Sequence, residues 1–200
     1  MTDVLSATPE GISRAVELLT AGKVVAFPTD TVYGIGVALS RRERLDDLFA
    51  LKARPADRRI PILVSDLAQA IGAGWEADER AHRLTERFWP GALTLVLAGS
   101  GETQAFRVPD HPVVLQLIRA AGPILSTSAN RSGEPETLGA DDVLIAFALQ
   151  QDGLAAVVDG GTAPGGVAST VLDLSVTPAR ILREGPVTRA QLENLIELAR

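Results

Sequence analysis

The chain has 200 residues, of which 46% are hydrophobic, and its formal net charge is −6. This size and composition allow one large core or two small ones, and the lack of a Ser/Gly-rich or charged linker favours one domain. The absence of cysteine excludes disulfides and Cys-ligated metals, and two histidines far apart in sequence argue against a zinc site. The acidic balance argues against non-specific nucleic-acid binding by the whole molecule but is compatible with a local basic groove.

A cytoplasmic location is expected, and the lack of cysteine agrees with a cytosolic enzyme. The N-terminus has no basic region followed by an apolar run, so no signal peptide is expected. No stretch approaches the ~18–20 apolar residues that a membrane-spanning helix needs.

Hydrophobic spacing in the first half of the chain predicts helices and strands in mixed order. A stripe of Ile12, Ala15, Val16 and Leu19 indicates a first helix with Gly22 as its C-cap. In chain order we expect a helix at 9–21, a strand at 24–27, helices at 42–53, 66–73 and 78–88 with a strand at 60–64 among them, and strands at 93–97 and 105–108.

The second half continues the same mixture. Thr188 and Gln191 form a capping box that predicts the start of the last helix. We expect a helix at 111–122, a polar loop after 123–126, a helix at 141–150, a strand at 155–159, a Gly-rich loop at 160–166, strands at 169–174 and 179–184, and a helix at 188–200. The order is not a strict β-α-β alternation, so the sequence predicts an α/β fold with a mixed sheet.

Common nucleotide and hydrolase motifs are absent from the sequence. There is no GxxxxGK[ST] phosphate loop, and the Gly34-x-Gly36 pair is not followed by the third glycine of a dinucleotide fingerprint. GxSxG, HExxH and CxxC do not occur either.

Four polar or cationic segments instead follow apolar elements. They are PTDTVYG (28–34), KARPADRR (52–59), FRVPDH (106–111) and STSANRSG (126–133). Ligands of open α/β sheets collect where strands end and loops diverge, and Arg, Lys and Ser in such loops suit an anionic ligand such as a nucleotide. Each segment alone is also compatible with an ordinary turn, a solvated loop or a helix start.

Taken together and in this order, the motifs resemble the YrdC-like threonylcarbamoyl-AMP synthase family. The resemblance rests on FPTDTVYGIG, Lys-x-Arg at 52–54, WPGALTLVL, RVPDHP, Ser-x-Asn at 128–130, STVLDL and ILREG. It covers residues 8–195 as one YrdC-like domain, with 1–7 and 196–200 as terminal tails, and corresponds to the short single-domain form. The implied fold is a twisted open mixed sheet flanked by helices, with a large concave cavity.

The resemblance implies an enzyme, a nucleotidyltransferase of the L-threonylcarbamoyladenylate synthase type. Such an enzyme makes threonylcarbamoyl-AMP and pyrophosphate from L-threonine, bicarbonate and ATP. The product then goes to a transferase complex that forms threonylcarbamoyladenosine in tRNA. The resemblance also implies contact with tRNA or double-stranded RNA, and Mg²⁺ carried by ATP with no metal site of the protein's own.

The family motifs imply a role for each polar segment. Lys52, Arg54, Ser128 and Asn130 correspond to a KxR–SxN tetrad around the nucleotide phosphates and are the expected catalytic residues. Arg58, Thr103 and Arg183 are implied as further ATP contacts. For L-threonine the implied contacts are Thr31, Tyr33, Arg107, Ser126 and Ser169, with Arg107 binding the carboxylate as a bidentate pair. Gly34 and Gly36 are expected to form a tight turn beneath the substrate.

Two departures from the family pattern concern the residues after Arg54. Some relatives have a threonine-contacting histidine near Ser65 or Asp66, and neither position is histidine here. The stretch between Arg54 and Pro61 is longer than in those relatives, which puts the alignment of Arg58 in question. The loop at 160–166 is compatible with a mobile lid and with an ordinary connection.

Two other functions fit the same motifs. One is a non-catalytic RNA-binding or ribosome-maturation module that uses the same concave surface. The other is a relative acting in carbamoyl-adenylate chemistry, which the lack of zinc-finger cysteines disfavours.

Overall fold

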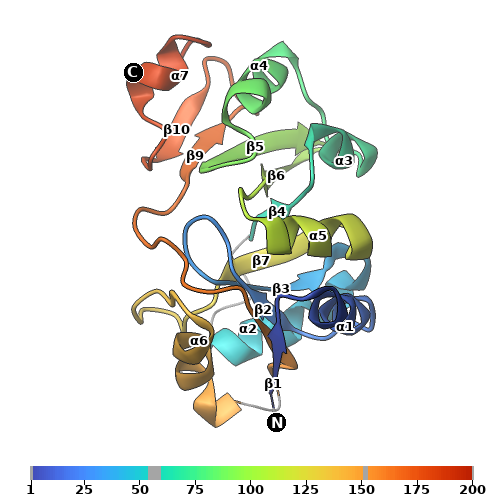
Figure 1. Cartoon of the computed structure of the whole chain (residues 1–200). Helices are drawn as coiled ribbons and strands as arrows, with labels where there is room; N and C mark the ends of the chain where they lie inside the picture. Colours follow the sequence, from blue (N-terminus) through green and yellow to red (C-terminus); the bar gives the residue numbers. More distant parts are fainter. Residues whose placement is uncertain (1, 54–59, 151–152, 200) are drawn as a thin grey trace.

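The computed structural model describes residues 2–53, 60–150 and 153–199. Within these ranges one mixed sheet of ten strands runs the length of the molecule in the order β1-β8-β2-β3-β7-β4-β6-β5-β9-β10 (Figure 1). The strands are β1 (Asp3–Ser6), β2 (Val25–Phe27), β3 (Gly34–Ala38), β4 (Ile62–Leu63), β5 (Leu93–Gly99), β6 (Glu102–Arg107), β7 (Ile124–Ser128), β8 (Ala156–Asp159), β9 (Thr170–Asp173) and β10 (Arg180–Arg183). The predicted α/β class with a twisted open mixed sheet is confirmed.

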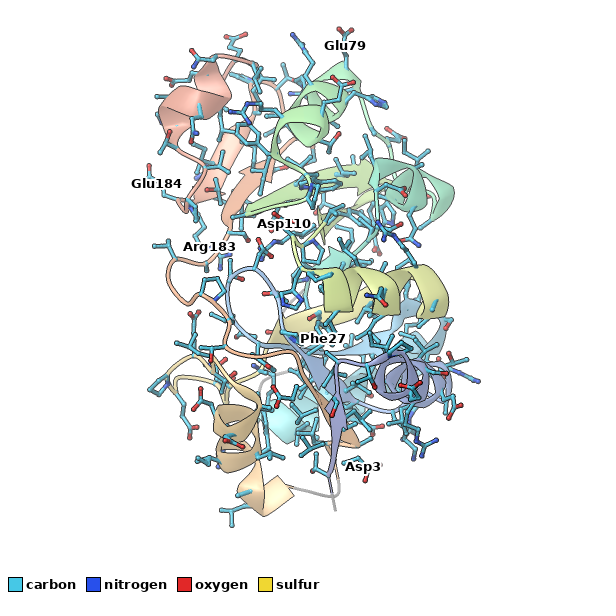
Figure 2. The ribbon with its side chains drawn as sticks, viewed as in Figure 1. Asp3, Phe27, Glu79, Asp110, Arg183 and Glu184 are labelled. Carbon is cyan, nitrogen blue, oxygen red and sulfur yellow. The ribbon has the colours of Figure 1, made fainter. Side chains whose placement is uncertain are left out.

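Helices cover the sheet on both faces. They are α1 (Pro9–Thr20), α2 (Leu45–Lys52), α3 (Leu67–Gly72), α4 (Glu79–Phe88), α5 (Pro112–Ala121), α6 (Ala140–Ala146) and α7 (Arg189–Glu193), with short 3-10 helices η1 (Leu39–Arg44) and η2 (Ala148–Gln150). Strand β2 shows why two layers form, because Val25 and Phe27 pack with α1 and α5 while Ala26 belongs to the other core. A strand buried on both faces needs apolar residues throughout. Figure 2 labels Phe27 close to α5.

Helices α1 and α5, which pack on the same face of the sheet, begin and end within one residue of their predicted bounds. Thr8 caps α1, and its Oγ1 accepts a hydrogen bond from Gly11 N at 3.3 Å. Nδ1 of His111 accepts from Val113 N at 3.3 Å and so caps α5. Gly22 and Gly122 follow the two helices with φ of +78° and +86°, a conformation that glycine adopts without strain.

Two segments at the N-terminal side differ from the sequence predictions. Asp3–Ser6, expected within a terminal tail, form the edge strand β1 and pair in parallel with β8. Gly34 and Gly36, expected in a tight turn, lie inside strand β3 between β2 and β7. The reason for glycine is close strand packing, because a Cβ at Gly36 would lie 2.4 Å from Leu125 O.

Three predicted helices are shorter or more irregular than expected. The helix at 42–53 starts as η1 and becomes α-helical only at Leu45. The helix at 141–150 is divided into α6 and η2 around Phe147. The last helix, expected over 188–200, ends at Glu193, although its capping box is present as predicted.

Candidate functional site

A cavity of about 370 Å³ lies over the middle of the sheet. Residues of β3, β4, β5, β6, β7 and β9 line it, and so do Arg183 at the end of β10 and four residues before β3, namely Thr29, Thr31, Val32 and Tyr33. These strands are neighbours in the sheet, so polar side chains far apart in sequence meet at one place. Figure 2 shows Arg183 at mid-height of the molecule, beside this region.

Strand β3 leaves room for the serines of strand β7. In the register of the two strands, Gly34 lies opposite Ser128 and Gly36 opposite Ser126. A Cβ at Gly34 would approach Ser126 Oγ to 3.2 Å and the Phe27 ring to 2.9 Å. Glycine at position 34 therefore leaves the space that the Ser126 side chain needs in order to line the cavity.

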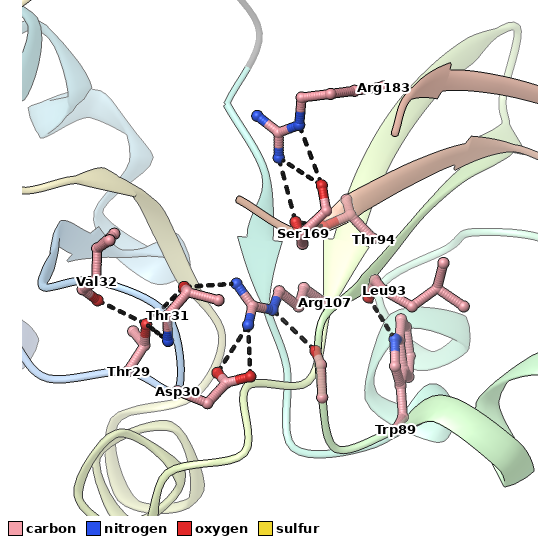
Figure 3. A network of polar contacts seen from close by, with 11 residues as sticks. Thr29, Asp30, Thr31, Val32, Trp89, Leu93, Thr94, Arg107, Ser169 and Arg183 are labelled. Carbon is pink, nitrogen blue, oxygen red and sulfur yellow. Dashed lines mark hydrogen bonds and ion pairs between the residues drawn. The ribbon is translucent and has the colours of Figure 1, made fainter. Parts of the chain in front are cut away.

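Arg107 is the most constrained cation of the cavity (Figure 3). Its Nη2 donates to both carboxylate oxygens of Asp30 at 2.7 Å, and its Nε donates to Gly91 O at 2.9 Å. Its Nη1 donates to Thr31 Oγ1 at 3.3 Å. The guanidinium is thus held along its Nε and Nη2 side, and Nη1 is the nitrogen that shares the cavity with Thr31.

Burial and neighbouring charges act on Arg107 in opposite directions. Burial lowers the pKa of the guanidinium from its usual value, whereas the charge and hydrogen bonds of Asp30 raise it. The positive charge of Arg183 lowers the pKa of Arg107 further. Two cations therefore face one cavity, and Asp30 compensates one of them.

Two threonines form a second polar contact at the same end of the cavity. Thr29 Oγ1 lies 3.1 Å from Thr31 Oγ1 and donates to Val32 O at 2.6 Å. The backbone N–H of Thr31 donates back to Thr29 Oγ1 at 3.2 Å. Both threonines are buried, so the turn that follows β2 is held by side-chain hydrogen bonds.

Arg183 approaches the cavity from the opposite end of the sheet. Its Nε and Nη2 donate to Ser169 O at 3.1 and 2.8 Å, and Nη2 also contacts Ser169 Oγ at 3.2 Å. Ser169 Oγ in turn lies 2.8 Å from Thr94 Oγ1. The expected ATP contact Arg183 and the expected threonine contact Ser169 are therefore directly bonded (Figure 3).

Lys52 binds the backbone of the Ser-x-Asn segment at 128–130. Its ammonium is buried and donates to Ser128 O and to Asn130 O, the latter at 2.5 Å. Ser128 Oγ donates to Asn130 Oδ1 at 2.6 Å. A buried charge is stable only with such partners, so Lys52 shapes the loop that carries Ser128.

The structure brings together all five residues expected to contact L-threonine. Thr31, Tyr33, Arg107, Ser126 and Ser169 all line the one cavity.

The residues expected to contact ATP are more scattered. Ser128 and Arg183 line the same cavity, while Lys52 and Asn130 lie directly behind Ser128. Thr103 lies in β6 opposite Ala98, outside the cavity lining formed by the described residues. Arg54 and Arg58 lie outside the described residues.

The Gly-rich loop at 160–166 is fastened to the cavity wall. The Tyr33 hydroxyl donates to Gly161 O at 2.7 Å and accepts from Gly160 N at 3.3 Å. Gly165 N donates to Thr31 O at 3.0 Å. Burial raises the pKa of Tyr33 above its ordinary value, which already keeps the hydroxyl protonated at neutral pH, so it can donate. These contacts favour an anchored connection over a lid.

The sequence motifs assign no individual role to the cavity residues Thr29, Thr94 and Glu136, nor to Asp30, which pairs with Arg107. Thr94 could have been noticed because it is a polar residue in the apolar run LTLVL. Its side chain is buried, with 4% of its surface exposed. Asp66, where the family resemblance leads one to look for a histidine, caps α3 by accepting from Gln69 N at 2.8 Å.

Comparison with known proteins assigns the chain to a family. The family model Sua5_yciO_yrdC, described as "Telomere recombination", matches residues 17–185. The chain belongs to the Sua5/YciO/YrdC family. A Bacillus subtilis threonylcarbamoyl-AMP synthase is 40% identical over 98% of this chain and 59% of its own length. A Mycobacterium tuberculosis protein named as a putative threonylcarbamoyl-AMP synthase is 34% identical over 93% of this chain and 89% of its own length.

A solved member of the Sua5/YciO/YrdC family has the same fold. The crystal structure of Pyrococcus abyssi Sua5 complexed with L-threonine superposes with a TM-score of 0.89 at 34% identity. It covers 100% of this chain, and this chain covers 62% of that protein. The chain thus spans about 60% of the length of the first of these relatives and of this solved structure.

The described residues contain neither a metal-binding cluster nor a membrane-spanning helix. No group of three or more His, Asp or Glu side chains there could hold a metal ion. The same part of the chain contains no helix long and apolar enough to cross a bilayer.

Proposed function

We propose that this chain is an L-threonylcarbamoyladenylate synthase, a nucleotidyltransferase that uses L-threonine, bicarbonate and ATP and releases pyrophosphate. The supporting observation is the meeting of Thr31, Arg107, Ser126, Ser169 and Arg183 around one cavity. A relative named threonylcarbamoyl-AMP synthase and a relative crystallised with L-threonine support this assignment.

The chemistry of this reaction explains why the cavity holds cations and hydroxyls and no nucleophilic triad. The amine of threonine takes up bicarbonate-derived CO2 to form a carbamate, and a carbamate oxygen attacks the α-phosphorus of ATP. The bond from that phosphorus to the bridging oxygen of pyrophosphate breaks. Two anions must be brought together, and negative charge builds on the leaving phosphates, so positioning and cations supply most of the rate.

The described residues suit this division of labour. Arg107 Nη1 and Thr31 form the end of the cavity suited to an amino acid, with Arg107 as the donor to its carboxylate. Arg183 uses Nε and Nη2 on Ser169, and its Nη1 makes no hydrogen bond to the described part of the chain. That nitrogen is therefore suited to phosphate oxygens. Ser128 Oγ, whose hydrogen goes to Asn130 Oδ1 in this structure, would turn this hydrogen toward a phosphate oxygen on the loop that Lys52 fixes.

Cofactor and partners belong to the same proposal. Mg²⁺ would arrive with ATP, held by phosphate oxygens and water, because the described residues offer no carboxylate cluster for it. The product would go to a transferase complex that modifies tRNA, and direct contact with tRNA and a cytoplasmic location are further predictions.

Pyrophosphate release tests the proposal. The protein is incubated with ATP, Mg²⁺, L-threonine and bicarbonate, and each of the last two is omitted in turn. We expect release that needs both substrates and that falls by about 10²–10³-fold in Arg183→Ala, as for loss of one well-placed donor. Arg119→Ala, an exposed arginine at the end of α5, is the matched control and should keep wild-type activity.

A second variant separates the two ends of the cavity. Arg107→Ala should raise the KM for L-threonine more than the KM for ATP, because Arg107 lies at the end assigned to the amino acid. Equal effects on both substrates would place the amino acid elsewhere. Pyrophosphate release that ignores threonine and bicarbonate would refute the synthase proposal, and tight tRNA binding without turnover would favour the RNA-binding alternative.

A further inference from the structure

The hydrogen-bond network of Thr29 determines which way the Thr31 hydroxyl points. A threonine hydroxyl has one hydrogen to donate and lone pairs that accept. Thr29 Oγ1 lies 2.6 Å from Val32 O, and a carbonyl oxygen only accepts, so the hydrogen of Thr29 is used there. In the 3.1 Å contact between the two hydroxyls, Thr31 must therefore be the donor and Thr29 the acceptor.

The other contact of the Thr31 hydroxyl fits this assignment. Arg107 Nη1 lies 3.3 Å from Thr31 Oγ1, and a guanidinium only donates. Thr31 Oγ1 thus donates to Thr29 and accepts from Arg107, and the capacity that remains to it is a lone pair. Since Thr31 lines the cavity, this hydroxyl offers a ligand an acceptor and no donor.

The two groups at this end of the cavity consequently have opposite polarity. Asp30 and Gly91 O fix the Nε and Nη2 side of Arg107, so Nη1 is its donor toward the cavity. Next to it stands the acceptor Thr31 Oγ1. An α-amino acid matches this pair, because its carboxylate accepts and its nitrogen carries N–H groups on the adjacent carbon.

We propose that Thr29 is a positioning residue that fixes Thr31 as a hydrogen-bond acceptor and thereby makes this end of the cavity selective for an α-amino acid over the corresponding 2-oxo acid. This rests on the proposed function, because it takes the amino acid to bind between Arg107 and Thr31. A 2-oxo acid would place its carbonyl oxygen against the Thr31 lone pair, and two acceptors repel. Without Thr29, the Thr31 hydroxyl turns and its hydrogen becomes available to that carbonyl.

The test compares two ligands that differ only at C2, L-2-aminobutyrate and 2-oxobutyrate. Their affinities are measured by titration calorimetry, directly or by displacement of L-threonine, on the wild type, Thr29→Val and Thr29→Ser. We expect the wild type to prefer the amino acid by about tenfold or more, the scale of one good polar contact. Thr29→Val should lose about tenfold of that preference, and Thr29→Ser, which keeps the hydroxyl, should retain it.

A matched control separates this role from a general loss of packing. Thr85 is another buried threonine, whose Oγ1 donates to His82 O at 3.0 Å on α4, and Thr85→Val removes a hydroxyl of the same kind. This variant should leave the ligand preference unchanged. A structural effect of Thr29→Val would weaken both ligands alike, whereas the proposed role changes their ratio.

Several results would overturn the inference. It fails if Thr29→Val keeps the wild-type preference or if Thr29→Ser loses it. If Thr29→Val does not fold, the wild type alone still tests the inference. Equal affinity of the wild type for L-2-aminobutyrate and 2-oxobutyrate would exclude Thr31 as an acceptor that selects the amino acid. If the wild type binds L-threonine and releases pyrophosphate but Thr29→Val discriminates normally, only this inference fails. If the wild type does neither, the proposed function fails and the inference with it.

Discussion

Asp30 and Arg107 form a nearly buried ion pair, with side chains 16% and 10% exposed and both carboxylate oxygens 2.7 Å from Nη2. The pair joins the segment after β2 to the end of β6, two elements that are not neighbours in the sheet. Asp30 therefore ties the two sides of the cavity together and compensates one of its two cations.

Asp30→Asn should destabilise the protein by about 3 kcal/mol, because it leaves the buried charge of Arg107 without its counter-ion. The free energy of unfolding is measured by urea denaturation. Asp3→Asn, an exposed aspartate of the edge strand β1, is the control and should change stability by less than about 0.5 kcal/mol. Equal stability of Asp30→Asn and the wild type would show that solvent already compensates Arg107.

Lys52→Met should lower the stability of the protein and weaken its apparent affinity for ATP. The substitution keeps an apolar stem of similar length but leaves the carbonyls of Ser128 and Asn130 without the ammonium that binds them. Orphaned buried acceptors cost about 1–3 kcal/mol each, and the loop carrying Ser128 loses its support. We expect a lower urea midpoint and a higher KM for ATP.

Lys23→Met is the comparison for Lys52→Met, because Lys23 is exposed after α1. It should change neither quantity. If Lys52→Met raises the KM for ATP without loss of stability, Lys52 acts on the nucleotide directly and not through the loop.

The sequence predicted more of the cavity's chemistry than of its geometry. Thr31, Arg107 and Ser126 could be found because motifs name residue types, and these residues do line one cavity. The prediction of a tight turn at Gly34 and Gly36 is wrong, since both lie in strand β3. A Gly-x-Gly after a proline is typical of a turn, which is why the sequence favours one. Only the register with β7 reveals that these glycines allow close strand contact.

Partners within the cavity could not be predicted at all. The contacts between Asp30 and Arg107, and between Thr94 and Ser169, join residues about 75 positions apart. Spacing along the chain carries no information on such pairs, because strand order decides them. The edge strand β1 escaped prediction for a related reason, since its four residues are mostly exposed and gain their order from pairing with β8.

Gly36→Ala should destabilise the sheet by about 2–3 kcal/mol. The added methyl group would meet Leu125 O at 2.4 Å and the Ile124 side chain at 2.8 Å, and a backbone oxygen in a paired strand cannot move aside cheaply. Urea denaturation of the two proteins provides the measurement.

Gly72→Ala supplies a control of opposite sign. A Cβ at Gly72 meets no described heavy atom within 4 Å, and Gly72 is a helical residue of α3. Alanine there should stabilise by up to about 1 kcal/mol through helix propensity. A neutral Gly36→Ala would mean that β3 and β7 separate at little cost.

His111 should make stability pH-dependent near neutrality. Burial lowers the pKa of His111 below its usual value, while Asp30 and Asp110 oppose this shift. Because its Nδ1 accepts from Val113 N as the cap of α5, the neutral ring is the form that fits the folded state. As pH falls through the ordinary histidine pKa, the unfolded chain takes up a proton before the folded one, so stability decreases until pH drops below the folded pKa.

The variant His111→Asn isolates this contribution, because asparagine caps a helix without titrating in this range. The free energy of unfolding of both proteins is measured by urea denaturation at several pH values from 8 to 5. We expect the wild type to lose stability relative to His111→Asn as pH falls, while carboxylates that titrate in both proteins cancel in the difference. A difference that stays constant over this range would mean that His111 accepts a proton as easily in the folded protein as in the unfolded chain, and that its cap on α5 tolerates the charge.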